Sequence, residues 1–306
     1  MQLKFTKESD FRQERDFSNK FSASFEFVMA HWQPLGRCLI YFVLPAALLM
    51  GILLGLAQSN ALRLITEGAS STSTPFGRLS NQFGAFQWLG MLVSLISYAL
   101  LAATVYGYVK VRMELPPEQE VTPALVGERV KYDAPRMAVS GLVAVVLIGL
   151  GFVLLFIPGI YLSIAVSLIW VIQSFEHKGV GSAISRNISL IKGKWWSTFG
   201  LAVVMSLLVA LMGMVFQLPQ VVPYVGKLLG WEWASSNLFL IAGNVVASAG
   251  GVMLYTLLLV ALMFQYFNLI ERKEGIGLRS LVDSLGNGPA PVAHNHAYRP
   301  DDEGEY

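Results

Sequence analysis

The chain has 306 residues, of which 54% are apolar and 14% are charged, and its mean hydropathy is +0.55. A soluble domain carries about 25% charged residues, so this composition excludes an ordinary soluble enzyme. The net charge is only +2, which gives no reason to expect a nucleic-acid partner. We therefore expect an all-α fold, a polytopic helical membrane protein with six transmembrane helices and amphipathic surface helices on the cytoplasmic side.

The first segment, residues 1–37, is charged and precedes the first long apolar run. Its apolar side chains are spaced for one face of an amphipathic helix that lies on the membrane: Phe17, Phe21, Phe25, Val28 and Met29. The segment is too long for the charged region of a cleavable signal peptide. We expect a cytoplasmic segment followed by a first span that acts as an uncleaved signal-anchor.

Six membrane spans are predicted within a transmembrane domain of residues 38–270. The longest uncharged run, Met137–Phe175, holds 39 residues. As a helix it measures about 58 Å, enough for two crossings of a hydrocarbon core of about 30 Å. Pro158-Gly159 at its centre predicts the turn of a hairpin, and Pro45 should kink the first span. The expected spans are Cys38–Ala57, Phe86–Val109, Met137–Ile157, Gly159–Phe175, Trp196–Gln217 and Asn244–Ile270.

The basic residues are distributed unevenly between the loops. Of the 22 Lys and Arg residues, 19 lie before span one, between spans two and three, between spans four and five, or after span six. The exceptions are Arg63, Arg78 and Lys227. The positive-inside rule then predicts that both termini lie in the cytoplasm, and the Ser- and Thr-rich loop between Asn60 and Gly84 is expected on the outer side.

The last uncharged run, Trp233–Ile270, has 38 residues and contains Gly250-Gly251, so it fits either one long span or a hairpin. A hairpin would move the cations that follow it to the outer side, against the charge distribution, and we favour one span. Residues 271–306 are expected to form a cytoplasmic tail, with a short helix over Gly277–Leu285 and disorder after residue 287.

Two more surface helices are expected between spans. The second begins with Thr122 as N-cap and Pro123 as first helical residue; its apolar face is Val121, Leu125 and Val130. The third ends at Gly193 and has one apolar stripe: Val180, Ile184, Ile188 and Ile191. Candidate contacts for anionic phospholipid headgroups lie beside that stripe: Arg186, Lys192 and Lys194. Each cation near an anionic surface contributes about 1 kcal/mol; the alternative role for these cations is to set the topology.

None of the expected spans contains Asp, Glu, Lys, Arg or His, which argues against proton-coupled or voltage-driven transport. Asn244 and Gln265 are the candidates for a polar path, and hydrogen bonding between packed helices is the simpler role. Close helix packing is predicted for Gly51 and Gly55, and for the series Gly243, Ala247 and Gly251. No metal-binding, nucleotide-binding or hydrolase motif occurs, so we expect neither a cofactor nor a metal, and no enzymatic activity.

Four short stretches resemble a family of bacterial membrane domains that are found alone or fused to glycerophosphodiester phosphodiesterases. They are Ile157–Tyr161, Glu176–Gly179, Ser189–Trp196 and Gln265–Gly275. The resemblance implies a six-span integral membrane protein of the bacterial cytoplasmic (inner) membrane, of poorly defined function. The resemblance implies no enzymatic activity. The activity of fused relatives lies in a soluble barrel of about 250 residues, and this chain is too short to contain that barrel as well as the membrane domain.

Three functions compete at this point. The leading hypothesis is a non-enzymatic membrane protein with a scaffold or accessory role, whose surface helices recognise phospholipid headgroups. The second is a carrier or channel for a lipid or a small uncharged solute, favoured by W-x-x-x-G at both Trp32 and Trp196, which suggests internal repeats. The third, an intramembrane enzyme, would need a nucleophile and a base, or metal ligands, at membrane depth, and no expected span contains His, Asp or Glu. The expected partners are membrane lipids, with a second copy or another membrane protein as alternatives.

Overall fold

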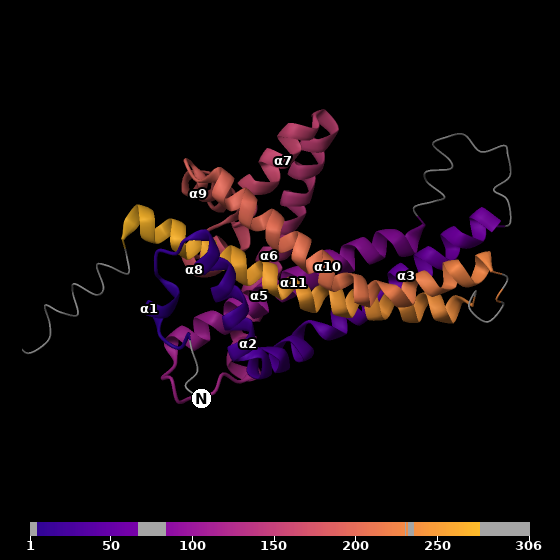
Figure 1. The fold of residues 1–306 in the computed structure, drawn as a ribbon, viewed down its shortest axis with the longest axis horizontal. Helices are drawn as coiled ribbons and strands as arrows, with labels where there is room; N and C mark the ends of the chain where they lie inside the picture. Colours follow the sequence, from indigo (N-terminus) through magenta and orange to yellow (C-terminus); the bar gives the residue numbers. More distant parts are fainter. Residues whose placement is uncertain (1–4, 67–83, 230, 232–235, 276–306) are drawn as a thin grey trace, which may run out of the picture.

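The computed structural model describes residues 5–66, 84–229, 231 and 236–275 (Figure 1). Every regular element in this part of the chain is a helix. The expected tail helix, the disorder after residue 287 and most of the outer loop at residues 60–84 lie outside the described residues. The helices are α1 (Glu8–Phe11), α2 (Phe17–Phe42), α3 (Leu44–Thr66), α5 (Ala85–Glu114), α6 (Pro123–Leu154), α7 (Phe156–Ala165), α8 (Ile169–Glu176), α9 (Val180–Ile191), α10 (Trp195–Leu228) and α11 (Asn237–Glu274).

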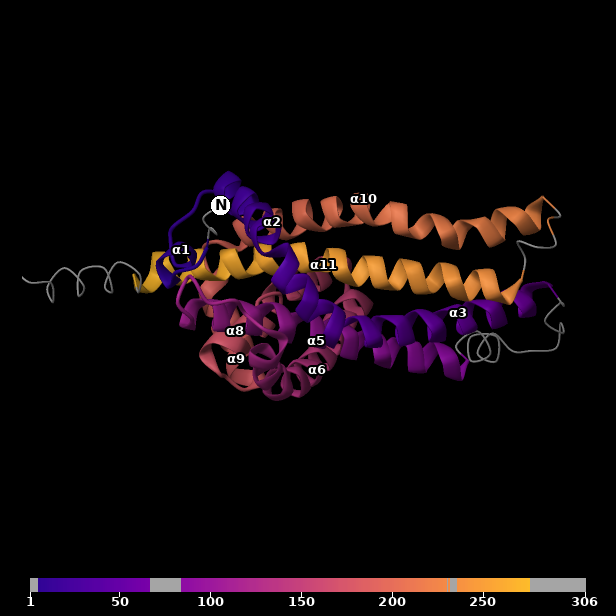
Figure 2. The same cartoon turned by 90° about the horizontal axis from the view of Figure 1, so that it is seen from below.

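The molecule is built around four long helices, α3, α5, α10 and α11, which run along its longest axis (Figures 1 and 2). The central helix, α11, packs against the other three and against α2. It continues without a break through Gly250-Gly251, so the expectation of one long helix rather than a hairpin is confirmed. We call these four helices the core bundle.

Small residues let the core bundle pack backbone against backbone. A Cβ atom added to Gly51 would lie 2.5 Å from Val245 Cα, and one added to Gly55 would lie 2.7 Å from Ile241 Cα. On the other side of α11, a Cβ on Gly243 would lie 2.7 Å from the Pro219 carbonyl oxygen. The predicted close packing is therefore confirmed for Gly51, Gly55 and Gly243, and the helices they join belong to one chain. It is wrong for Gly251, where an added Cβ would have no atom within 4 Å.

The N-terminal surface segment and the start of the first expected span form one helix, α2, which ends at Phe42. The chain turns at Val43 and α3 begins at Leu44. The break lies just before Pro45, whose missing N–H and bulky ring weaken the preceding helical turn and kink or break a helix, so the predicted kink is confirmed. The apolar helix that is long enough to cross a membrane therefore begins at Leu44, later than the expected Cys38.

The hairpin made by α6 and α7 differs from the prediction in its turn. The turn is at Leu155, three residues before Pro158, and the expected turn at Pro158-Gly159 is wrong. Proline fits the first turn of a helix, where its missing N–H loses no intrahelical bond, so Pro158 lies inside α7. The expected span Gly159–Phe175 is also divided, because residues 166–168 separate α7 from α8.

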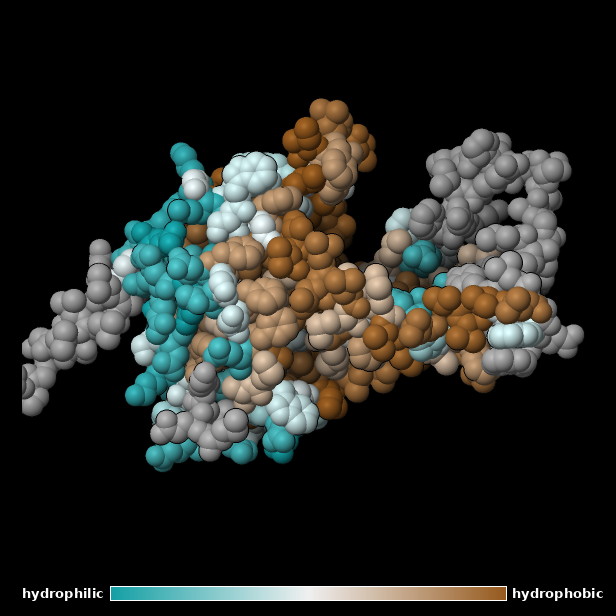
Figure 3. All heavy atoms as spheres, viewed as in Figure 1, coloured by the Kyte–Doolittle hydropathy of each residue, from teal (hydrophilic) through white to brown (hydrophobic). Residues whose placement is uncertain are grey.

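Among the described residues, six helices or helix pairs are long and apolar enough to cross a membrane; α7 and α8 together count as one of them. The surface agrees with this composition. Hydrophilic residues gather at one end of the molecule, which we call the charged end, and apolar residues cover much of the rest of the visible face (Figure 3). On α10, Leu211, Val215 and Leu218 are each more than 60% exposed, which in water would leave a large unprotected apolar face. Lipid is the solvent that suits this surface.

The expected apolar face of α2 is only partly packed against the protein. Phe21, Phe25 and Val28 are partly buried and contact the core, whereas Phe17 and Met29 are 43% and 65% exposed. The fully buried side of α2 also holds polar residues, among them Lys20 and Ser24. The stripe that the sequence predicts therefore lies at the edge of the packed face.

Candidate lipid-headgroup site

The site starts where α9 ends and α10 begins. After Ile191 the chain turns through Lys192, Gly193 and Lys194, and the Lys194 N–H donates to the Ile191 carbonyl at 2.8 Å. Gly193 has φ +79°, a left-handed conformation that suits glycine, so the predicted end of this helix is confirmed. The turn leaves Lys192 and Lys194 exposed. We call residues 192–196 the basic corner.

Aromatic side chains support the basic corner. The Trp195 ring stacks on Phe199 at 5.1 Å and on Tyr161 of α7 at 6.0 Å, while Trp196 is 77% exposed. The Trp195 Nε1–H is buried and has no acceptor among the described residues. Tryptophan beside lysine is typical of the depth where the hydrocarbon meets lipid headgroups.

Arg186 has a different role from the two lysines. Its guanidinium lies 3.0 Å from a Glu176 carboxylate oxygen and 2.6 Å from one of Glu274. Burial alone would lower the pKa of Arg186, but its hydrogen bonds to these two carboxylates raise it above the usual value. Arg186 therefore joins α8, α9 and α11, and the structure does not bring it together with Lys192 and Lys194 on an open surface.

A buried lysine lies behind the basic corner. Lys20 of α2 is 2% exposed; its ammonium donates to Gln265 Oε1 at 2.7 Å and to Ser197 Oγ at 3.4 Å. Burial, together with the positive charges of Arg272 and Lys194, lowers the pKa of Lys20 to about 8, and Asp16 opposes this shift. Cations are therefore concentrated at this corner.

Gln265 and Asn244, the two candidates for a polar path, belong to separate hydrogen-bond clusters. Gln265 Nε2 donates to Thr198 Oγ1 at 2.8 Å. Asn244 accepts from Gln220 Nε2 at 2.7 Å and donates to Gln58 and to the Leu240 carbonyl. The two residues are 21 positions apart on one helix, about 31 Å, which matches the thickness of a hydrocarbon core. They lie at the two ends of one span, and each is used in helix packing.

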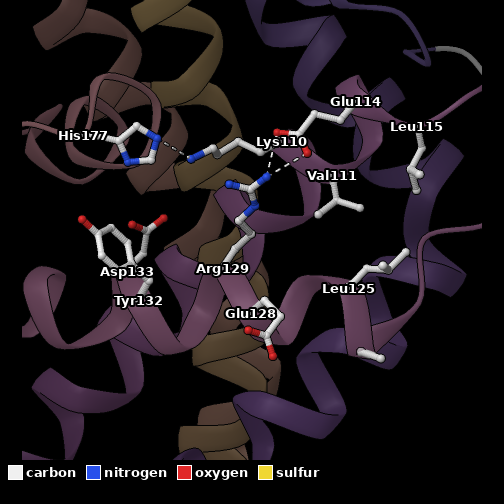
Figure 4. Close-up of a pocket in the computed structure, with 11 residues that line it drawn as sticks. Lys110, Val111, Glu114, Leu115, Leu125, Glu128, Arg129, Tyr132, Asp133 and His177 are labelled. Carbon is white, nitrogen blue, oxygen red and sulfur yellow. Dashed lines mark hydrogen bonds and ion pairs between the residues drawn. The ribbon is translucent and has the colours of Figure 1, made fainter.

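A cleft of about 630 Å³ at the charged end, between α5, α6 and the turn after α8, was not anticipated from the sequence. Figure 4 shows Arg129 directed at Glu114 and His177 directed at Lys110; Arg129 Nη2 lies 2.9 Å from both Glu114 oxygens. Desolvation and the Lys110 ammonium lower the pKa of His177, so it adds no charge at neutral pH. Glu128 and Asp133 also line the cleft, and its acids outnumber its charged bases. The cleft therefore does not suit an anionic headgroup.

Sequence reasoning missed Lys20 and Asn187. Asn187, on α9, is fully buried and its Nδ2 donates to the Ala165 carbonyl at 2.6 Å, at the break between α7 and α8. Neither contact could be predicted from the local sequence pattern, because each joins residues that are far apart in the chain. Within the described residues, no three His, Cys, Asp or Glu side chains come together as metal ligands.

Comparisons with known proteins give no match: no family model, curated protein or solved structure is similar to this chain. The resemblance to the bacterial membrane domains therefore stays a prediction, and the functional argument rests on the chain's own geometry.

Proposed function

We propose that this is a non-enzymatic protein of the bacterial cytoplasmic membrane that binds anionic phospholipid headgroups through its basic corner. The observation that carries the proposal is the exposure of Lys192 and Lys194 beside Trp196, where the charged end of the molecule borders its apolar surface. The distribution of Lys and Arg supports a charged end, with both termini, in the cytoplasm.

The chemistry of the corner favours an anionic ligand over a zwitterionic one. Two exposed lysines contribute together about 2 kcal/mol toward an anionic surface, a factor of about 30 in affinity. The buried charge of Lys20 adds to the local potential, since Lys194 already lowers its pKa. A scaffold or accessory role in the membrane fits such a fixed lipid contact.

Native mass spectrometry of the protein released from mixed phosphatidylglycerol and phosphatidylcholine tests this proposal. The wild type should retain phosphatidylglycerol, and Lys192→Gln with Lys194→Gln should lose it. Lys131→Gln is the matched control, because Lys131 is a 78% exposed lysine at the charged end and lies away from the corner. Equal phosphatidylglycerol retention by the wild type, the double variant and the control would contradict the proposal.

A second candidate function, a carrier for a lipid or a small uncharged solute, is favoured by the break between α7 and α8. Broken helices are where carriers bind substrates, and the buried Asn187 Oδ1 has no hydrogen-bond donor among the described residues. Lipid transfer in proteoliposomes, compared between the wild type and Asn187→Leu, tests this candidate function. Lipid transfer between leaflets that occurs with wild type and stops with Asn187→Leu would favour the carrier, and a membrane that stays equally asymmetric with both would reject it.

A further inference from the structure

The hairpin of α6 and α7 is the feature whose arrangement the proposed headgroup contact does not explain. In Figures 1 and 2 it leaves the core bundle at an angle, and its tip ends well short of the bundle's far end. Apart from α6, α7 has few contacts with other helices.

The stack of Tyr161 on Trp195 measures how deep the hairpin reaches. Trp195 is the first residue of α10, so it marks the depth at which that helix enters the membrane. Tyr161 lies at the same level, because the two rings stack at 6.0 Å. From Tyr161 to the turn at Leu155 the chain has six residues, about 9 Å of helix. A crossing needs about 30 Å.

The break between α7 and α8 belongs to the charged end. Asn187 binds the Ala165 carbonyl at 2.6 Å from α9, and its neighbour Arg186 pairs with Glu176 and Glu274. Beyond the break, the Ser174 carbonyl of α8 accepts from the Lys110 ammonium at 2.7 Å. Of the two helices on this arm of the hairpin, α7 and α8, only α7, with 10 residues, extends from this layer toward the tip. Its length of about 15 Å is half a hydrocarbon core.

The tip has the composition of a segment that stays in hydrocarbon. The five residues Val153 to Ile157 are 68–84% exposed and all are apolar. The far ends of the core helices differ, because α3 carries Gln58, Ser59 and Asn60 there, and α11 begins with Asn237 after Ser236. A turn in water would leave the five apolar side chains exposed, whereas acyl chains would cover them.

Both backbone polar groups of Leu155, the residue at the turn, are hydrogen-bonded. Leu155 N–H donates to the Gly151 carbonyl at 3.0 Å, and Gly159 N–H donates to the Leu155 carbonyl at 3.3 Å. Pro158 has no N–H to leave unpaired, which matters because unpaired backbone groups are costly in hydrocarbon. A Cβ on Gly151 would lie 2.9 Å from Gly159 Cα, so the two arms touch directly and the hairpin supports itself.

We propose that α6 and α7 form a re-entrant hairpin that enters and leaves the membrane on the charged side. Its tip contacts the acyl chains of that one leaflet, and the chain crosses the membrane only with α3, α5, α10 and α11. Both ends of the hairpin remain on the same side, so the distribution of basic residues is unchanged. The inference depends on membrane insertion and is independent of headgroup binding at the basic corner.

Spin-label accessibility of the full chain in phosphatidylcholine vesicles tests the depth of the tip. A nitroxide is attached at Leu155→Cys, with Gly84→Cys at the far end of α5 and Lys131→Cys at the charged end as references. The native Cys38 is fully buried and contributes little label. At position 155 we expect high collision rates with oxygen and at least tenfold lower rates with an aqueous nickel chelate than at positions 84 and 131.

Two results would overturn the proposal. Nickel accessibility at position 155 equal to that at position 84 would show a tip in water, and therefore a complete crossing. Protection from both oxygen and nickel would show a tip covered by protein, including a second copy, rather than by acyl chains. Val153→Cys, where the side chain is 84% exposed, repeats the measurement if Leu155→Cys does not fold.

Discussion

The core bundle and the α6–α7 hairpin are both made of uncharged helices, but they are held in different ways. The bundle joins residues distant in sequence, as where Gly51 meets Val245. The hairpin joins neighbours, Gly151 and Gly159, and leaves its tip exposed. The bundle helices carry polar residues at both ends, whereas the hairpin has them only at its base. The comparison teaches that a long uncharged run establishes a lipid environment and does not by itself establish a crossing.

The largest expected effect is in the core bundle. Gly51→Ala with Gly55→Ala places two methyl groups against the backbone of α11, at 2.5 and 2.7 Å from Cα atoms that cannot move aside. We expect a loss of about 4 kcal/mol in the free energy of unfolding, since overpacking costs about 1–3 kcal/mol per site. Titration with a denaturing detergent measures it. Gly213→Ala in α10, with no atom within 4 Å of its Cβ, is the control, and equal stability of the two variants would contradict the packing.

The next effect is a pH dependence at the base of the bundle, where Lys20 binds Gln265. The pKa of Lys20 is lowered from 10.5 to about 8, so below pH 8 the folded and unfolded states are both protonated and the cost of burying the charge is complete. Between pH 8 and 10.5 the folded state loses this proton first and stability rises, by up to about 3 kcal/mol.

Thermal unfolding at pH 7.5 and pH 10 checks this sign. The wild type should gain stability at the higher pH relative to Lys20→Met, in which the titrating group is removed. Lys131→Met, at an exposed lysine, should follow the wild type. A wild type and a Lys20→Met variant with parallel pH profiles would show that Lys20 keeps an ordinary pKa.

A moderate effect is expected at the base of the hairpin. Asn187→Ala removes the donor to the Ala165 carbonyl and should cost about 1–2 kcal/mol, because a buried carbonyl loses its partner. Ser185→Ala, on an exposed position of the same helix, should change stability little. Thermal unfolding in detergent compares the two, and an Asn187→Ala variant as stable as Ser185→Ala would show that the break needs no side-chain support.

The smallest effect is expected at the hairpin tip. Leu155→Ala should cost less than about 0.5 kcal/mol in detergent, because Leu155 is 68% exposed and leaves no cavity. Leu259→Ala in α11, at 2% exposure, should cost about 2–5 kcal/mol. The ratio of the two losses measures how separate the hairpin is from the bundle, and similar losses would mean that the tip is packed in the folded protein.

Much of the architecture follows from local patterns in the sequence. The uninterrupted α11, the break before Pro45, the close packing of Gly51 and Gly55 and the end of α9 at Gly193 were all predicted, because each depends on length, proline, small residues or a glycine conformation. The position of the hairpin turn was not, since proline fits both a turn and the first turn of a helix. The break after α7 was also missed, because its support comes from Asn187, which lies in another helix.

The candidate site was predicted only in part. Lys192 and Lys194 are exposed as a headgroup contact requires, but Arg186 is occupied by Glu176 and Glu274. Which cations are free depends on carboxylates brought near by folding, and no spacing rule along one helix reveals them. Lys20 is the clearest case, because a lysine in a surface segment ends buried against Gln265.

Cysteine labelling from outside intact cells tests the contrast between bundle and hairpin most directly. A membrane-impermeant maleimide is applied to cells that produce Gly84→Cys, Leu155→Cys or Lys131→Cys, before and after permeabilisation. The account predicts that position 84 is labelled from outside, position 131 only after permeabilisation and position 155 in neither case. Labelling of position 155 from outside, as at position 84, would show that α6 and α7 cross the membrane and would contradict the account.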